Sequence, residues 1–411
     1  MKTLKFRQGA IVLGAEVNGV AVIRSLGRLG VRCGLVHATS RADFAHRSRY
    51  LACSESIPGD SEDAAVEAAI HRISSVIGSE RVVLIPTTDR FSQYLSRHRE
   101  SLGGHFVVCN PDGGLCDTFL DKWKTAELCR DKGVLIPSTA CPQTAAELAE
   151  VAATMTYPVI VKPRYTFASG FPGKNAVFQD ATGLTAFLAD GSLLGRCVVQ
   201  QIVRSGDGDI LVTATYSSAD RKVQAIYSGR KLRQYLPDYG ATCFGISEKH
   251  SVLEATTQRF LDEIGYRGFA ALEFARSRDD GKAYFLELNT RTYYHNQLFA
   301  DAGIDLTQVA FLDAINRDFR EILGPLVQRD GLRWLDFRRD FLSMRIKRRQ
   351  GRITLAGWLA SLLTARSYAY WNPQDPLPFV VACLWRSREL GLGLFRWILS
   401  FGREVPKRLA G

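Results

Sequence analysis

No stretch of this 411-residue sequence reaches the roughly 18 uninterrupted apolar residues expected of a membrane-spanning helix. The apolar run after the basic N-terminus is interrupted at Glu16, so we expect no secretory signal peptide. The nine cysteines never form C-x-x-C and are scattered, which predicts free thiols and neither disulfides nor structural zinc. With 46 % hydrophobic and 23 % charged residues, the composition is typical of a folded soluble protein. Free thiols indicate a reducing compartment, so we expect a cytoplasmic protein.

Two common nucleotide-binding fingerprints are also missing. The P-loop pattern G-x-x-x-x-G-K-[ST] does not occur, and Gly14 and Gly19 do not complete G-x-G-x-x-G. Residues 9–38 nevertheless read as an apolar strand, an amphipathic helix that ends at Gly30, and a second strand, which is the pattern of a βαβ unit. The sequence therefore predicts an α/β beginning without a dinucleotide site, and the chain length predicts two or three domains.

Positive charge is concentrated toward the C-terminus. Residues 331–411 contain 15 Lys or Arg and 5 Asp or Glu, so they carry +10 of the net charge of +11. The same segment holds five of the six tryptophans, but no nucleic-acid-binding motif accompanies them. We therefore expect no nucleic-acid partner.

Apolar residues at helical spacing near the end of the chain predict a basic amphipathic helix; they are Leu390, Leu394, Trp397, Ile398 and Phe401. Its apolar face would pack against the rest of the chain or against a second subunit in a homodimer. Alternatively, the helix would lie on anionic lipid at the inner face of the membrane, close to a membrane-handled substrate. The sequence leaves both interpretations open.

Residues 269–289, FAALEFARSRDDGKAYFLELN, read as two apolar strands joined by a turn at Asp-Asp-Gly, which indicates a β-hairpin. A hairpin centred on this turn sets Glu273 directly across from Glu287, where two anions would repel each other. A divalent cation resolves that conflict, and Asn289 adds an amide oxygen on the same face, so the pattern predicts a Mg²⁺ site. Arg291 would hold an anionic group beside the metal. The alternative is an exposed hairpin face with a Glu–Arg pair.

Residues 156–165 and 197–203 read as strands that flank a loop rich in glycine and small residues, TFASGFPGKNA. With Lys162 near its entrance, this loop predicts a flexible flap over phosphate groups. An earlier strand, RVVLIPTTD, places Asp89 at its carboxyl end, where open α/β sheets bind ligands. Asp89 is therefore a candidate substrate contact, and the alternative is that it caps the next helix. A further helix is predicted over residues 119–133.

The order of these parts resembles the ATP-grasp superfamily, and within it the carboxylate–amine ligases similar to D-aspartate ligase. The matching motifs, over roughly residues 10–325, are LDKWKT around Lys122, VIVKPR around Lys162, the loop ASGFPG, the segment VVQQIVRSGDGD, and the pair LEF and FLELNTR. The resemblance implies an α/β (α+β) architecture with three parts: a Rossmann-like pre-ATP-grasp domain at 1–115, a two-lobed ATP-grasp domain at 116–328, and a mainly helical, basic C-terminal region at 329–411.

The resemblance also implies roles for individual residues. Those that would contact ATP are Lys122, Lys162, Ser169 and Gly170 at the phosphates, and Gln200, Gln201, Ile202, Val203 and Asp209 around adenine and ribose. Those that would hold Mg²⁺, or Mn²⁺ as an alternative, are Glu273, Glu287 and Asn289. Lys162 and Arg291 would be catalytic, with Arg291 steadying the γ-phosphate or an acyl phosphate. Many relatives have a glutamate where Gln201 stands, although a glutamine can still accept a hydrogen bond through its carbonyl oxygen.

Phosphoryl transfer to a carboxylate needs positioning and charge neutralisation more than a nucleophilic side chain. The resemblance therefore implies a ligase that joins a small-molecule carboxylate to an amine through an acyl phosphate, with release of ADP and phosphate. The alternatives are another ATP-grasp reaction, such as that of a carboxylase or a thiol-acceptor ligase, and a non-catalytic nucleotide-binding module. No biotin-attachment or CoA-binding segment supports the former, and the complete set of acidic residues with Arg291 argues against the latter.

Residues 229–243, GRKLRQYLPDYGATC, combine cations with tyrosines and suit an anionic substrate, as does a similar motif of these ligases. The candidates are Lys231, Arg233 and Tyr235; the alternative is an exposed basic edge of a sheet. Tyr294 and His295 follow the metal strand closely enough to reach the substrate, and packing or capping is the alternative for both.

Overall fold

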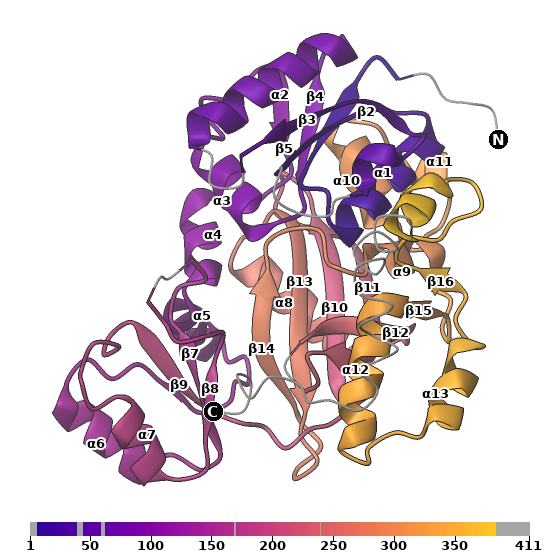
Figure 1. Ribbon diagram of the computed structural model, residues 1–411. Helices are drawn as coiled ribbons and strands as arrows, with labels where there is room; N and C mark the ends of the chain where they lie inside the picture. The colour runs from indigo at the N-terminus through magenta and orange to yellow at the C-terminus, as the bar shows by residue number, and fades with distance from the viewer. Residues whose placement is uncertain (1–5, 39–43, 59–61, 168–169, 239, 384–411) are drawn as a thin grey trace.

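The computed structural model describes residues 6–38, 44–58, 62–167, 170–238 and 240–383. Their strands form three sheets, of five, four and seven strands. Figure 1 shows the five-stranded sheet at the top, the four-stranded sheet at the lower left and the seven-stranded sheet in the centre. The mixed α/β class expected from the sequence is confirmed. Among the helices of the described ranges, none combines the length and the apolar character that crossing a lipid bilayer requires. All nine cysteines are free thiols.

The five-stranded sheet is parallel throughout, in the order β3-β2-β1-β4-β5. Its strands are β1 (Gly9–Leu13), β2 (Arg32–Ala38), β3 (Leu51–Ile57), β4 (Val82–Pro86) and β5 (Phe106–Val108). The connections contain helices α1 (Val17–Leu29), α2 (Asp63–Ile77) and α3 (Asp89–Arg97) and the 3₁₀ turn η1 (Ala45–Arg47). The predicted βαβ unit is confirmed, and α1 ends at Gly30, whose φ of 92° disfavours any side chain. Strand β1 is apolar and buried along its whole length, as a parallel strand covered on both faces must be.

The helix predicted over residues 119–133 is two helices, because Asp121 interrupts it. Helix α4 (Gly113–Leu120) ends before Asp121, and α5 (Lys122–Asp131) begins after it. The Asp121 carboxylate accepts hydrogen bonds from the backbone N–H groups of Trp123 and Lys124, at 2.9 and 3.1 Å, which makes it the N-cap of α5. This cap places Lys122 at the first position of a helix instead of in its middle.

The four-stranded sheet is antiparallel, in the order β6-β9-β7-β8. It contains β6 (Thr139–Ala140), β7 (Val159–Pro163), β8 (Ala176–Phe178) and β9 (Cys197–Gln201), with helices α6 (Ala145–Thr154) and α7 (Ala181–Phe187). Both strands predicted in this region are confirmed as β7 and β9. The glycine-rich loop connects β7 to β8, so it lies at one end of this small sheet.

The seven-stranded sheet has the order β14-β13-β10-β11-β12-β15-β16. Its strands are β10 (Ile210–Ser217), β11 (Val223–Tyr235), β12 (Ala241–Ser247), β13 (Gly268–Arg276), β14 (Ala283–Asn289), β15 (Arg333–Leu335) and β16 (Ser367–Tyr368). The predicted hairpin is formed by β13 and β14, and Glu273 is the register partner of Glu287. Beyond this pair the register shifts by one residue, so that Phe274 pairs with Phe285. The opposition of the two carboxylates is confirmed.

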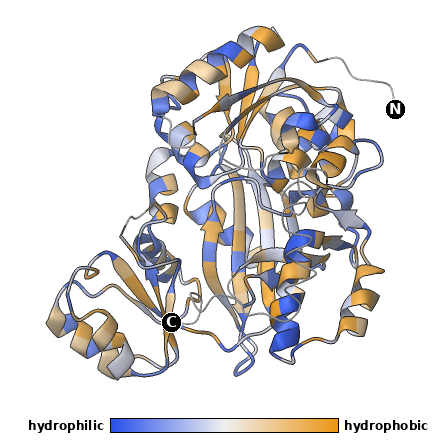
Figure 2. Ribbon diagram, in the orientation of Figure 1, coloured by the Kyte–Doolittle hydropathy of each residue, from blue (hydrophilic) through white to orange (hydrophobic). Residues whose placement is uncertain are grey.

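The remaining helices are α8 (Ser251–Glu263), α9 (Asn296–Asp301), α10 (Leu306–Ala314), α11 (Phe319–Leu323), α12 (Phe337–Arg349) and α13 (Leu355–Leu362). The region after residue 329 was expected to be mainly helical, yet it also adds β15 and β16 to the seven-stranded sheet. Trp334 and Trp358 are buried there, and Figure 2 shows α12 as largely hydrophilic. The amphipathic segment 390–401 lies outside the described residues, so its packing in a homodimer or on lipid stays a prediction.

A buried ion pair ties the C-terminal segment to α1. The Nε of Arg24 lies 3.0 Å from Oδ2 of Asp375, and both side chains are almost completely buried. The Ser48 hydroxyl and the Arg49 backbone N–H also donate to this carboxylate, at 2.8 and 2.9 Å. Burial lowers the pKa of Arg24, and the adjacent Asp375 carboxylate opposes that shift. The five-stranded sheet and the chain near residue 375 are therefore one packed unit.

We expect Asp375→Asn to destabilise the protein by about 3–5 kcal/mol, because it leaves a buried guanidinium without its counter-ion. The measurement is the midpoint of denaturant unfolding followed by tryptophan fluorescence. The control is Gln374→Ala, which changes an exposed neighbour and should leave the midpoint unchanged. Equal midpoints for the two variants would show that the ion pair does not hold the segment.

Candidate active site

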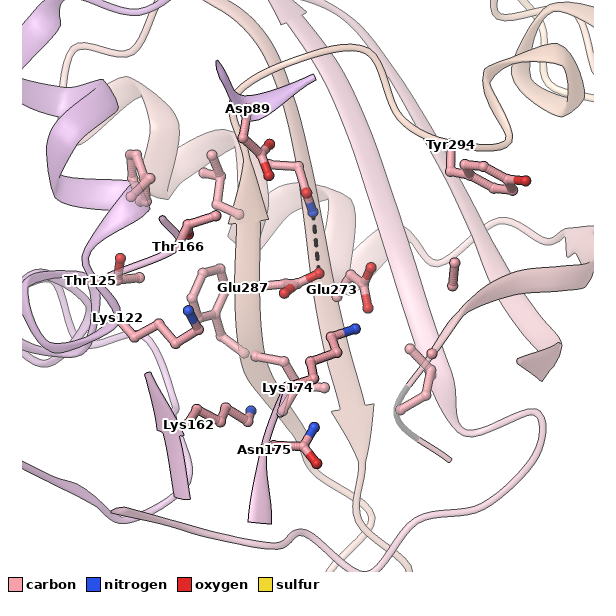
Figure 3. A pocket seen from close by; sticks show the side chains of 18 of the residues that line it. Asp89, Lys122, Thr125, Lys162, Thr166, Lys174, Asn175, Glu273, Glu287 and Tyr294 are labelled. Carbon is pink, nitrogen blue, oxygen red and sulfur yellow. Dashed lines mark hydrogen bonds between the residues drawn. The ribbon is translucent and has the colours of Figure 1, made fainter. Parts of the chain in front are cut away.

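A cleft of about 500 Å³ lies between the four-stranded and the seven-stranded sheets. Its walls come from α5, β7 and β9 on one side and from β11, β13 and β14 on the other. Glu16 and Asn18, which follow β1, and Asp89, which follows β4, close one end. The carboxyl ends of the parallel strands therefore face the cleft, as they face ligands in other open α/β sheets. Figure 3 shows part of this cleft.

One part of the cleft has mainly apolar walls. The residues there are Ile136, Ile160, Val198, Ile210 and Leu288, with Thr139 and Gln200 as polar neighbours. Gln200 donates a hydrogen bond from Nε2 to Oγ1 of Thr139, at 3.0 Å. Apolar walls with a few oriented polar groups suit a planar ring.

Three lysines line the next part of the cleft: Lys122 on α5, Lys162 on β7 and Lys174 in the loop before β8. Figure 3 shows all three on the same side of the two glutamates. Burial lowers the pKa of Lys122, and it lowers the pKa of Lys162 to about 8, a shift that Glu287 opposes and the other two lysines reinforce. Lys162 also donates to Oε1 of Gln200, at 3.0 Å. This crowding of desolvated cations favours binding of a polyanion.

Opposite the lysines, Glu273 and Glu287 stand side by side on β13 and β14 (Figure 3). Glu273 is buried, accepts a hydrogen bond from the Tyr293 hydroxyl, and lies 2.6 Å from Nζ of Lys231. Burial raises the pKa of Glu273, against the effect of Lys231. Burial also acts to raise the pKa of Glu287, but the ammonium groups of Lys231 and Lys162 outweigh it and lower that pKa to about 2. Glu287 is therefore a stable anion that is accessible from the cleft.

A chain of hydrogen bonds extends from Glu287 to the end of the cleft. Asn289 donates from Nδ2 to Oε1 of Glu287, at 3.3 Å, and its Oδ1 accepts from Nη2 of Arg291, at 3.0 Å. The Nε of Arg291 donates to Oδ1 of Asp89, at 2.7 Å. Asp89 does not cap α3, because Thr88 is the N-cap and accepts from the Phe91 backbone N–H. The carboxylate of Asp89 instead orients the guanidinium of Arg291.

The structure does not bring every residue expected around adenine and ribose into the cleft. Gln200 lines it, whereas Gln201, Ile202 and Val203 do not. Successive residues of β9 point to opposite faces, so Gln200 and Gln201 cannot both face the cleft. Asp209, expected at the ribose, is instead paired with Arg276 and Arg278, at 3.1 and 2.7 Å. Gly170 does not line the cleft, and Ser169 lies outside the described residues.

A β-bulge in β11 decides which side chains of the basic segment face the cleft. Regular alternation would point Lys231, Arg233 and Tyr235 to one face, but the pairing with β12 shifts between Lys231 and Arg233. Arg233 turns away and donates to both carboxylate oxygens of Asp340 on α12, at 2.7 and 2.9 Å. Gln234 and Lys231 line the cleft, whereas Arg233 and Tyr235 do not. Strand β11 lies between β10 and β12, so the alternative of an exposed sheet edge is also wrong.

Of the two candidates Tyr294 and His295, Tyr294 lines the cleft and His295 does not. Its hydroxyl donates to Oδ2 of Asp336, at 2.7 Å. His295 is buried and packs against Phe299 and Trp334, and burial lowers its pKa well below the usual value. His295 is therefore a neutral packing residue, and the packing alternative describes it better than substrate contact.

Sequence reasoning missed several cleft residues, namely Glu16, Asn18, Thr139, Lys174, Asn175, Thr242 and Arg339. Lys174 and Asn175 stand in the glycine-rich loop, so their position in TFASGFPGKNA was a usable signal. Arg339 comes from α12, in the basic C-terminal region, and nothing in the sequence links it to the hairpin. Its place in the cleft depends on packing alone.

No protein-family model matches the chain. D-aspartate ligase of Enterococcus faecium is 20 % identical over 353 residues, which cover 79 % of this chain and 81 % of that protein. An ADP complex of N5-carboxyaminoimidazole ribonucleotide synthetase superposes with a TM-score of 0.60 at 14 % identity, over 81 % and 82 % of the two chains. The L-amino acid ligase of Bacillus licheniformis gives 0.59 at 16 % identity, over 80 % and 79 %. The resemblance to the ATP-grasp superfamily that the sequence predicts is confirmed. The expected resemblance to D-aspartate ligase is confirmed as well.

The resemblance to ATP-grasp enzymes implies Mg²⁺, and the donor set of the cleft can be tested against it. The described residues contain no cluster of three or more His, Cys, Asp or Glu side chains around a common point. The cleft offers Glu287 and Asn289 side by side, with Glu273 across the strand pair. Mg²⁺ usually takes one or two carboxylates and completes its shell with phosphate oxygens and water. Two carboxylates and an amide oxygen therefore fit this ion.

The lowered pKa of Lys162 can be tested by chemical labelling. Because that pKa is about 8, about half of the Lys162 amine is neutral at pH 8, so it should react with a small amine-directed reagent faster than a lysine of ordinary pKa near 10.4. The measurement is peptide mass spectrometry across a pH series, with exposed Lys282 as the internal reference.

Glu287→Gln serves as the second variant in this test. Since the Glu287 anion raises the pKa of Lys162, its removal should lower that pKa further and speed labelling below pH 8. If Lys162 and Lys282 showed the same pH dependence, the electrostatic description of the cleft would be wrong.

Proposed function

We propose that this ATP-grasp protein is a carboxylate–amine ligase. In this proposal the γ-phosphoryl group of ATP passes to a substrate carboxylate, an amine displaces the phosphate of the acyl phosphate, and ADP and phosphate are released. The observation that carries it is the opposition, within one cleft, of three lysines, of which Lys122 and Lys162 are desolvated, and the paired carboxylates of Glu273 and Glu287. Phosphoryl transfer needs this kind of positioned charge and no nucleophilic side chain.

The nucleotide would lie along the wall formed by the four-stranded sheet. Its adenine would occupy the apolar part of the cleft beside Ile160 and Val198, with Gln200 as a hydrogen-bond partner. Its phosphates would then reach Lys122 and Lys162, whose lowered pKa values show how strongly burial disfavours their charged forms without a nearby anion. Bound phosphate would supply that anion and return both lysines to the charged form.

Mg²⁺ would be held by Glu287 and Asn289, with Glu273 completing the set, and Mn²⁺ is an alternative ion. When bound, this metal would neutralise negative charge that develops on the phosphoryl group during transfer. Lys231 and the Tyr293 hydroxyl keep Glu273 in place through their contacts with its two oxygens. The protein therefore contributes a rigid set of oxygen ligands on two paired strands.

The carboxylate substrate would meet the nucleotide at Arg291. The Arg291 guanidinium is oriented by Asp89 and Asn289, and its planar shape suits two oxygens of a phosphoryl or acyl-phosphate group. Residues of the loop between β7 and β8, including Lys174, line the same space. Closure of this loop over the phosphates would exclude water, which otherwise hydrolyses an acyl phosphate.

We place the ligase in the cytoplasm because all nine of its cysteines are free thiols. Its substrates would be a small carboxylic acid and a small amine. The carboxylase reaction would use bicarbonate in place of the carboxylic acid, and the thiol-acceptor reaction would use a thiol in place of the amine, so the substrate dependence of ADP release distinguishes them. A non-catalytic binding module would release no ADP at all.

The experiment that tests the proposal is a screen of carboxylic acids against amines, followed through ADP and phosphate release. We expect release to depend on ATP, on Mg²⁺ and on one acid–amine pair. Formation of AMP and pyrophosphate would refute the acyl-phosphate route. Release that required bicarbonate in place of the carboxylic acid, or a thiol in place of the amine, would assign one of the other ATP-grasp reactions.

We expect Glu287→Gln to reduce turnover by more than about a hundredfold, because loss of a metal ligand removes several kcal/mol of transition-state stabilisation. The measurement is ADP release as a function of Mg²⁺ concentration. Glu248→Gln is the matched control, since Glu248 pairs with Arg230 outside the cleft. Normal turnover and normal Mg²⁺ dependence in Glu287→Gln would remove Glu287 from the metal site.

We expect Arg291→Lys to be nearly as inactive as Arg291→Ala, because an ammonium cannot hold Asp89, Asn289 and a phosphoryl group at once. The measurement is kcat for ADP release at saturating ATP. Arg276→Lys is the control, since Arg276 pairs with Asp209 away from the cleft. Turnover close to that of the unmodified protein in Arg291→Lys would show that a point charge suffices at this position.

A further inference from the structure

The cations that suggested an anionic substrate are already neutralised within the fold. Each of the three lies within 2.7 Å of a carboxylate oxygen: Arg230 of Glu248, Lys231 of Glu273, and Arg233 of Asp340. Recognition of an anionic substrate by residues 229–233 would therefore require an ion pair to break, and the pairs of Lys231 and Arg233 are buried, which makes breaking them costly.

Of the other cations that line the cleft, all but one either face the phosphate part or are hydrogen-bonded to neighbouring side chains. Lys122, Lys162 and Lys174 face the phosphate part, and Arg291 is bonded to Asp89 and Asn289. The exception is Arg339, in the first turn of α12, which lines the cleft and whose side chain is 30 % exposed. Its closest carboxylate oxygen is Oδ2 of Asp336, at 3.8 Å from Nε, which is too far for a hydrogen bond.

The guanidinium of Arg339 is held in position without using its donors. It lies over the ring of Tyr294, with Cζ 4.2 Å from the ring centroid. Tyr294 is itself fixed because its hydroxyl donates to Asp336, which also accepts from the Arg339 backbone N–H at 3.3 Å. Within the described ranges, this guanidinium donates no hydrogen bond, so its planar set of N–H groups is available to a ligand.

A second polar group that lines the cleft also lacks a hydrogen-bond partner within the described part of the chain. Thr242 lines the cleft, is 1 % exposed, and its Oγ1 makes no hydrogen bond within the described part of the chain. Buried hydroxyl groups are ordinarily hydrogen-bonded, so an orphaned one that lines a cleft indicates a missing ligand or water. Arg339 lies over the ring of Tyr294. Figure 3 shows Tyr294 on the far side of the two glutamates from Lys122 and Lys162.

We propose that Arg339 recognises a carboxylate group that is carried by a substrate and takes no part in the reaction. The proposal rests on the ligase function above and names its substrate class: an α-amino acid as the amine, or a dicarboxylic acid as the donor. A planar guanidinium stacked on a fixed ring presents two parallel N–H groups, which match the two oxygens of a carboxylate. Arg339 is thus a specificity residue that the C-terminal region contributes to the cleft.

The test compares charged substrates with uncharged analogues in the same ADP-release assay. One arm uses α-amino acids and their carboxamides as amines, and the other uses dicarboxylic acids and their monoamides as donors. We expect Arg339→Gln to raise KM for the charged form in one arm by roughly tenfold to hundredfold, the value of hydrogen bonds to a charged group. KM for ATP and the rate with the uncharged analogue should stay the same.

Two further variants separate recognition from folding. Arg338→Gln changes the exposed neighbour on α12, which does not line the cleft, and should leave every constant unchanged. Arg339→Lys keeps the charge but not the planar pair of donors, so it should restore only part of the affinity. If Arg339→Gln lowered the rates of charged and uncharged substrates alike, or changed neither, the proposal would be wrong.

An assay independent of turnover keeps this inference distinct from the ligase proposal. Phenylglyoxal modifies accessible guanidinium groups, and the same amino acids and dicarboxylic acids should slow its reaction with Arg339 but not with Arg338, as measured by peptide mass spectrometry. Protection without ADP release in any arm would refute the ligase function and keep the carboxylate site. Absence of protection by every member of the panel would overturn the site itself.

Discussion

Two like charges on neighbouring strands are the constraint on which the cleft depends. Glu273 and Glu287 are register partners on β13 and β14, and opposed anions destabilise a sheet unless positive charge lies close by. Lys231 provides that charge from β11, at 2.6 Å from Glu273, and Lys162 contributes from the opposite sheet. A buried ion pair such as Lys231–Glu273 is weak evidence for stability. The grouping of these charges is better explained by a ligand that binds to them.

The two sheets place desolvated groups of opposite charge on the two walls of the cleft. On one side, burial disfavours the charged forms of Lys122 and Lys162, and on the other it raises the pKa of Glu273. A polyanion with its divalent cation would relieve both sides at once, because the anion neutralises the lysines and the cation neutralises the glutamates. The same charges therefore weaken the empty fold and favour the bound state.

Distant parts of the chain hold this arrangement in place. Asn18, in the first turn of α1, donates to the backbone carbonyl groups of Thr87 and Thr292, at 2.7 and 2.9 Å, and so fixes the five-stranded sheet against the segment after β14 that carries Arg291. Arg24 and Asp375 connect the same sheet to the C-terminal segment. The C-terminal region is consequently part of the site, since its helix α12 places Arg339 in the cleft and pairs Asp340 with Arg233.

The sequence by itself determined the βαβ unit, the hairpin and the opposition of Glu273 and Glu287, because turn chemistry and strand alternation act over a few neighbouring residues. Only the tertiary structure decided which carboxylate each cation meets. Lys231 and Arg233 pair with residues 42 and 107 positions away, and a bulge between them reverses the face on which Arg233 lies. No local pattern encodes such pairings, because they depend on how separate elements pack.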